Sequence, residues 1–177
     1  MKIPSNKIES AASQDPFSRY TLSAVQLDVE HKRLMATDGH ILAIIPAEVE
    51  PEDHSGLISL ETIKAIRGME KRSKASCKVQ TNGKVTAHSI SGEHLEQEYS
   101  TGRFPNVDMV VPKFDGPPTV SIDVRLLMRL AEALKSEAIG KNEPAFVSLW
   151  VKDANSPVLV KSTKDADSVG VIMPCRP

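Results

Sequence analysis

Two stretches of this sequence share one order of elements, and this internal repeat constrains the fold more than any other feature. Residues from about 57 to 100 pass from a short apolar run to a segment with helical spacing, and then to three runs in which apolar and polar residues alternate. Residues from about 118 to 174 repeat that order. A single β-α-β-β-β unit cannot bury its apolar face alone. The repeat therefore predicts an α+β fold in which antiparallel sheets and two main helices pack pseudo-symmetrically.

The two predicted helices have recognisable starts. Ser59 is a candidate N-cap for the first helix, and either Ser121 or Asp123 caps the second. In the first helix, apolar residues recur three apart at Ile63, Ile66 and Met69. In the second helix, the predicted apolar stripe consists of Val124, Leu127, Leu130 and Leu134.

Short polar segments predict the turns. Asn82-Gly83 is a strong hairpin signal between two alternating runs. The segment from Thr37 to His40 separates two other apolar runs, and Gly39 can take a positive φ there without strain. The first 50 residues resemble a third unit whose helix is reduced to the stretch Ser5–Ser13. We expect two segments, residues 1–112 and 113–177, in one compact body.

Composition excludes several classes of protein. The 177 residues carry 22 Lys and Arg against 23 Asp and Glu, so any nucleic-acid binding must come from local charge placement. Aromatic residues make up 4%, which argues against a base-stacking platform. Cys77 and Cys175 lie far apart, which fits a reducing compartment. The N-terminus lacks a secretory apolar region and no run is long enough to span a membrane. We expect a cytoplasmic protein without a membrane partner.

Asp38 and His40 are the most suggestive pair for chemistry. One hypothesis is a small metal-dependent hydrolase that uses Asp38 and His40, with His88 as a further candidate. No metal-site, nucleophile or phosphate-binding motif accompanies them. The favoured interpretation is a turn in which Asp38 caps backbone N–H groups. We therefore predict no catalytic residue, no metal and no cofactor.

Four segments together resemble the bacterial DNA polymerase III beta sliding clamp family. They are "KRLMATDGHILA", "YSTGRFPNVDMVVPK", "SIDVRLLMRLAEAL" and "SVGVIMPCRP", and they occur in the family's order. The resemblance runs from Arg19 to Arg176 and covers parts of the middle and last domains. It implies a shortened, DNA-clamp-like protein that is not an enzyme. The implied function is a DNA replication or repair accessory protein of the polymerase processivity factor type.

The resemblance also implies a groove that docks clamp-binding linear peptides from DNA polymerase, clamp loader and repair proteins. A largely aliphatic lining suits a peptide that is anchored by Leu and Phe side chains. The matching positions are Leu22, Thr37, Gly39, His40, Ile41, Leu42, Pro105, Met109, Val110, Val171, Ile172, Met173, Pro174, Cys175 and Arg176. Two family positions differ here, because Ile41 replaces an Arg and Val107 replaces a Tyr.

Clamps of this family face duplex DNA with basic helices, which implies a second interface. Basic residues fall on one face of each predicted helix. The candidate DNA-binding residues are Arg19, Tyr20, Lys64, Arg67, Lys71, Arg125 and Arg129. A homo-oligomeric ring would encircle DNA. The alternative is a monomeric clamp-like adaptor or decoy that forms no ring.

Overall fold

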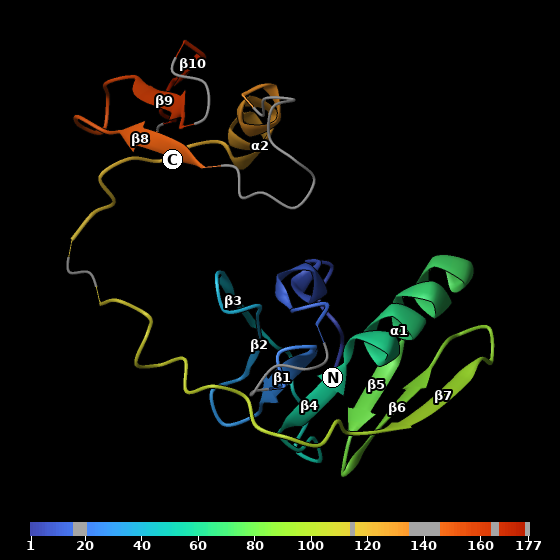
Figure 1. The fold of residues 1–177 in the computed structure, drawn as a ribbon. Helices are drawn as coiled ribbons and strands as arrows, with labels where there is room; N and C mark the ends of the chain where they lie inside the picture. Colours follow the sequence, from blue (N-terminus) through green and yellow to red (C-terminus); the bar gives the residue numbers. More distant parts are fainter. Residues whose placement is uncertain (16–20, 114–115, 135–145, 164–166, 176–177) are drawn as a thin grey trace. The chain divides into compact units, whose positions relative to one another are not determined.

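The computed structural model describes residues 1–15, 21–113, 116–134, 146–163 and 167–175 (Figure 1). The chain divides into two compact units, Met1–Val111 and Pro112–Pro177, and each is described by itself. All pairings between the described strands are antiparallel, so the α+β class with antiparallel sheets and two main helices is confirmed. No helix of the described part is long and apolar enough to cross a membrane.

The first half of the first unit contains a short 3-10 helix and three consecutive strands. The bounds are η1 Ile8–Ala11, β1 Ala24–Asp28, β2 Arg33–Thr37 and β3 Leu42–Pro46. The reduced helix predicted near Ser5–Ser13 is therefore η1. A fourth strand, β4 (Gly56–Ser59), completes a sheet in the order β3-β2-β1-β4.

The second half of the first unit is the predicted β-α-β-β-β unit. Its helix is α1 (Leu60–Ser73), and Ser59 caps it by accepting a hydrogen bond of 3.0 Å from the Thr62 N–H. Its other sheet has the order β5-β6-β7, with β5 Lys78–Thr81, β6 Lys84–His88 and β7 His94–Glu98. Gly83 turns the β5–β6 hairpin with a φ of +96°, as the Asn82-Gly83 signal predicted.

The segment at the start of each half pairs with a strand of the other half. β4 immediately precedes α1, yet it pairs with β1 of the other half, with Val25 opposite Ile58. In return, Met1 and Val79 of β5 exchange both backbone hydrogen bonds, at 2.5 and 3.1 Å. One continuous core results, and it contains Ile8, Val25, Leu34, Ile58, Ile63, Ile66, Val79 and Val85 among others.

Among its described residues, the second unit holds one helix and one three-stranded sheet. The elements are α2 Val124–Ala133, β8 Val147–Trp150, β9 Val158–Ser162 and β10 Val169–Ile172, and the sheet order is β10-β9-β8. Asp123, one of the two predicted caps, accepts a hydrogen bond of 2.9 Å from the Arg125 N–H. Gly170 lets the helix approach closely, because a Cβ there would lie 2.6 Å from Leu130 Cδ1.

Two expectations for the second unit were wrong. Val124 was assigned to the buried stripe of the helix, but it is exposed, while Leu134 is buried and Leu127 and Leu130 are half-buried. The segment before the helix was expected to be a strand, but Val120–Ile122 lies outside any strand. The buried core among the described residues of this unit consists of Leu134, Val158, Val160 and Ile172, and Val120 and Ile122 pack against it.

Candidate functional site

The turn between β2 and β3 is held by side chains on both of its sides. Asp38 Oδ1 accepts hydrogen bonds from the backbone N–H groups of His40, at 2.8 Å, and Ile41, at 2.9 Å. Thr37 Oγ1 donates to Ile41 O at 2.5 Å and accepts from the Gly39 N–H at 3.1 Å. The N–H groups of Ile41 and His40 lower the pKa of Asp38. Gly39 has a φ of +94°, so the turn has the predicted geometry.

The geometry of the turn does not favour the hydrolase hypothesis. Asp38 uses its carboxylate to cap the backbone of the turn. His88 lies on β6, where its Nδ1 is 3.3 Å from Nδ1 of His94 on β7. Within the described residues, no three His, Cys, Asp or Glu side chains are grouped to hold a metal ion.

The turn forms one wall of an apolar cavity of about 330 Å³. The opposite wall comes from the connector, residues 99–113, which follows β7. The lining residues are Leu22, Thr37, Gly39, His40, Ile41, Leu42, Pro105, Val107 and Val110. All of these positions except Val107 were predicted from the sequence as members of one groove.

The connector contributes differently from the prediction in two places. Met109 was predicted as a groove residue, but it is exposed and does not line the cavity. Val107 is buried and lines it instead. The sequence marked Val107 only as the position where the family's Tyr is replaced, although its alternation with Pro105 in an extended segment could have indicated that both face the same side.

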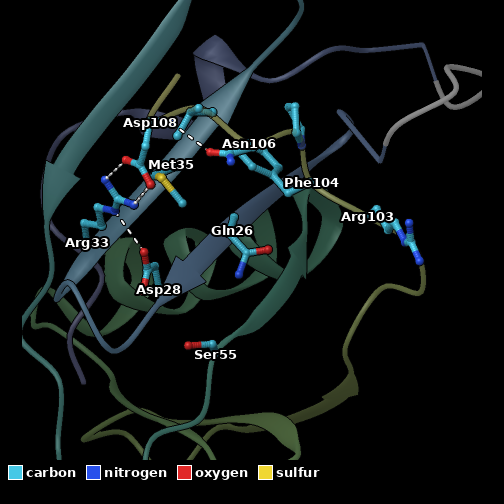
Figure 2. A pocket seen from close by; sticks show the side chains of 11 residues that line it. Gln26, Asp28, Arg33, Met35, Ser55, Arg103, Phe104, Asn106 and Asp108 are labelled. Atoms are coloured by element: carbon cyan, nitrogen blue, oxygen red, sulfur yellow. Dashed lines mark hydrogen bonds and ion pairs between the residues drawn. The ribbon is translucent and has the colours of Figure 1, made fainter. Parts of the chain in front are cut away.

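A second cavity of about 330 Å³ shares Pro105 and Val107 with the apolar one. Its lining also includes Met35 and Phe104, but it is richer in polar side chains, and we call it the polar cavity. Figure 2 shows Arg33 on β2 between two carboxylates, Asp28 on β1 and Asp108 in the connector. Arg33 Nε donates to Asp28 at 2.9 Å, while Nη1 and Nη2 donate to Asp108 at 2.7 and 3.0 Å.

The polar cavity was not predicted from the sequence. Its other polar lining residues are Gln26, Ser55, Arg103 and Asn106. These residues come from three segments that only the folded sheet and connector bring together. An extended ligand that leaves the apolar cavity past Pro105 would meet amide, hydroxyl and guanidinium groups there.

The predicted groove residues near the C-terminus belong to the second unit. Val171, Met173 and Cys175 are exposed, and Pro174 is half-buried. Ile172 is buried against Val158 and Val160, so its side chain stabilises the core of that unit. Arg176 lies outside the described residues.

The predicted DNA-binding residues differ in their exposure and in whether a carboxylate already pairs with their charge. On α1, Lys64 and Lys71 are exposed, whereas Arg67 is partly buried, lies 3.4 Å from Glu9 and donates to Asn6 O at 2.6 Å. On α2, Arg129 is exposed, and Arg125 forms an ion pair of 2.5 Å with Asp123, the N-cap of its own helix. Arg19 and Tyr20 lie outside the described residues.

Comparison with solved structures identifies the fold. The beta sliding clamp of Caulobacter crescentus, solved with bound polyethylene glycol, superposes with a TM-score of 0.71 at 21% identity over 95% of this chain. The chain has the sliding-clamp fold. The DNA polymerase III beta chain of Streptococcus pneumoniae gives a TM-score of 0.65 at 19% identity over 96% of the chain. The resemblance noted in the sequence is therefore confirmed at the level of structure.

The clamp fold is shared over only part of the solved clamps. The chain spans 46% of the Caulobacter clamp and 46% of the Streptococcus clamp. A Pseudomonas aeruginosa DNA polymerase III subunit beta bound to griselimycin gives a TM-score of 0.55 at 19% identity, with 96% of this chain and 61% of that chain covered. No protein-family model matches the chain, and no curated protein matches it.

Proposed function

We propose that this chain is a non-catalytic, clamp-like accessory protein of DNA replication or repair that docks linear peptides. The observation that carries the proposal is the apolar cavity between the Thr37–Leu42 turn and the connector. Its aliphatic walls suit Leu or Phe side chains of an extended peptide. The partners we propose are clamp-binding segments of DNA polymerase, clamp loader and repair proteins.

Two solved clamps support a ligand site on this fold. The Caulobacter clamp carries polyethylene glycol in a region proposed to tether the beta motif, and the Pseudomonas clamp binds griselimycin. In this chain, the rigid turn and the polar cavity beside Pro105 would present backbone and side-chain groups to such a ligand. A preformed cavity lowers the ordering cost of binding.

The affinity follows from the size of the apolar contact. Burial of a Leu-Phe pair contributes roughly 3–6 kcal/mol before ordering costs. An extended peptide with further backbone contacts then reaches roughly micromolar affinity.

The test is a fluorescence anisotropy titration of the full chain with a labelled Q-x-x-L-F peptide. Val110→Glu places a charge in the apolar wall and should weaken binding at least about tenfold. Val111→Glu is the matched control, because Val111 is the next residue and is also exposed but does not line the cavity. A peptide with Ala in place of Leu and Phe should bind neither protein. Equal affinity of wild type and Val110→Glu would refute the assignment of the cavity.

A second candidate function is weak binding of duplex DNA through α1. Lys64 and Lys71 are exposed, and neither forms an ion pair with any described residue. Arg67 is compensated by Glu9 and Glu70, so we propose a smaller contribution from it. Arg129 is the corresponding exposed cation of α2.

A further inference from the structure

The described residues of the second unit contain the elements of only half of the first unit. Each half of the first unit has three consecutive antiparallel strands, β1-β2-β3 in one half and β5-β6-β7 in the other. The part of the second unit that the structure describes has one such set, β8-β9-β10, and one helix. The first unit therefore shows how a half of this kind is completed.

In the first unit, each set of three strands has its first strand covered by a segment from the other half. β4 covers β1, with Gln26 opposite Leu57. Met1 covers β5 through its two backbone hydrogen bonds with Val79. Neither β1 nor β5 is left as an open edge at these positions.

We call the pairing of the segment before a helix or at the start of a half with the first strand of the other half a joint. The second unit contains both a first strand and a segment before its helix, and within its described residues the two are not paired. β8 lies at the edge of its sheet. Residues 120–122 precede the cap of α2 as β4 precedes α1, and they are paired into no sheet. Cys175 N–H donates to Ser121 O at 2.8 Å, just as Ser100 N–H donates to Leu57 O at 2.8 Å. Ser121 thus occupies the position of Leu57 relative to its own half, and its other side is open.

The surface around the open joint is apolar. Val25 and Leu27 of β1 are 0% exposed, whereas Val147 and Leu149 of β8 are 41% and 51% exposed. Leu149 is opposite Val160, so it lies on the face of the sheet that contains the core of the unit. On α2, Val124 and Leu126 are exposed, while Leu60 and Thr62 at the corresponding positions of α1 are buried.

The sequence of β8 gives no protection to its edge. Proteins usually protect an open edge strand with a charged residue, a proline or a bulge. β8 reads Val-Ser-Leu-Trp and contains no charged residue or proline. An uncharged strand of this kind is suited to pair with another strand.

We propose that a second copy of this chain completes the second unit. Residues 120–122 of each copy pair with β8 of the other, so two half-domains form one domain with the architecture of the first unit. A second copy fits because a single chain carries both an open edge and an unpaired segment, and a twofold axis joins both pairs at once. By analogy with Gln26 and Leu57, Ser148 of one copy lies opposite Ser121 of the other. This inference does not depend on the peptide site.

The first experiment measures the mass of the full chain in solution by sedimentation equilibrium. The wild type should form a dimer, and Leu149→Glu should weaken its association at least about tenfold, because the charge would be buried at the joint. Val169→Glu is the matched control, since Val169 is 50% exposed and pairs with Lys161 on the opposite face of the same sheet. Circular dichroism checks that the variants are folded. A wild type that stays monomeric, or a Leu149→Glu variant that associates as strongly as wild type, would overturn the proposal.

The second experiment tests the register by cross-linking. In a Cys175→Ser background, Ser121→Cys combined with Ser148→Cys should form a dimer linked by disulfides on oxidation, because directly opposite residues in a sheet lie within disulfide range. The control combines Ser121→Cys with Lys161→Cys, which is beside Ser148 on the central strand β9. Equal cross-linking in both would show that the copies associate in another way.

Discussion

Arg33 on β2 holds Asp108 of the connector through two parallel hydrogen bonds of 2.7 and 3.0 Å. Nε of the same guanidinium donates a hydrogen bond of 2.9 Å to Asp28 Oδ2, which fixes its orientation. A bidentate pair restricts the direction as well as the distance of its partner. It therefore positions the segment that supplies Pro105, Val107 and Val110 to the apolar cavity.

We predict that Asp108→Ala weakens peptide binding several-fold. The substitution frees the connector, so peptide binding must then order it. Asp108 is exposed, so the midpoint of urea unfolding should change little. Glu96→Ala is the control, because it removes an exposed ion pair with Lys84 on β6 and β7 that touches neither cavity. Anisotropy titration checks both, and an equal loss in the two variants would contradict a positioning role for Asp108.

We predict that Gly56→Ala destabilises the protein by about 1–3 kcal/mol, as overpacking does. A Cβ at Gly56 would lie 2.6 to 2.7 Å from three ring atoms of Tyr99. Tyr99 cannot yield easily, because its hydroxyl is 2.6 Å from His54 O and 2.9 Å from Thr81 O. Urea denaturation measures the change. Gly68→Ala within α1 is the comparison, and it should stabilise by up to about 1 kcal/mol through helix propensity.

Asp53 should make stability depend on pH in the acid range. Burial raises its pKa, but hydrogen bonds from the Glu50 N–H and Thr81 and the Met1 ammonium group outweigh burial and lower it below 3.8. A lowered pKa in the folded state stabilises the fold above 3.8, and that contribution is lost as the pH falls through the folded pKa.

We predict that Asp53→Asn lowers the free energy of unfolding at pH 7 by about 2 kcal/mol, because it weakens buried hydrogen bonds to a charged group. The difference from wild type should shrink as the pH falls below 3.8. Urea denaturation across this range provides the measurement. A difference that is constant with pH would show that the Asp53 charge does not stabilise the fold.

We predict that duplex DNA binding is weak, depends on salt and requires α1. Affinity should fall steeply between roughly 50 and 200 mM salt, because phosphate contacts release counterions. The double variant Lys64→Glu with Lys71→Glu should abolish DNA binding. Lys32→Glu with Lys78→Glu changes the net charge equally at exposed positions outside α1, and this variant should retain most of the DNA binding. Filter binding distinguishes the pairs, and an equal loss in both would indicate attraction by net charge alone.

The sequence by itself determined the local elements of this protein. Helical spacing and Ser59 predicted α1 and its start, and Asn82-Gly83 predicted the β5–β6 hairpin. The Thr37–His40 turn was also predictable, because Asp38 caps N–H groups only two and three residues away. Each of these features depends on contacts within a few residues of the chain.

Part of the candidate site was predictable only through the resemblance to clamps. Leu22, the turn and Pro105 are far apart in the sequence, and no spacing rule places them in one cavity. Val107, which lines the cavity, was missed, and Met109, which was predicted as a groove residue, is exposed and lies outside the lining. The direction of each side chain depends on the path of the folded connector, and no local sequence pattern gives that path.

Only the tertiary structure decided how the repeats are joined. The repeat predicted that a strand precedes each helix, but not that β4 would leave its own half and pair with β1. The apolar stripe predicted for the second helix included Val124, which is exposed, and the buried core among the described residues of the second unit is small. A sequence pattern records which face of an element is apolar. Which other segment covers that face is settled by the whole fold, because partners distant in the sequence compete for the same edge and the same core.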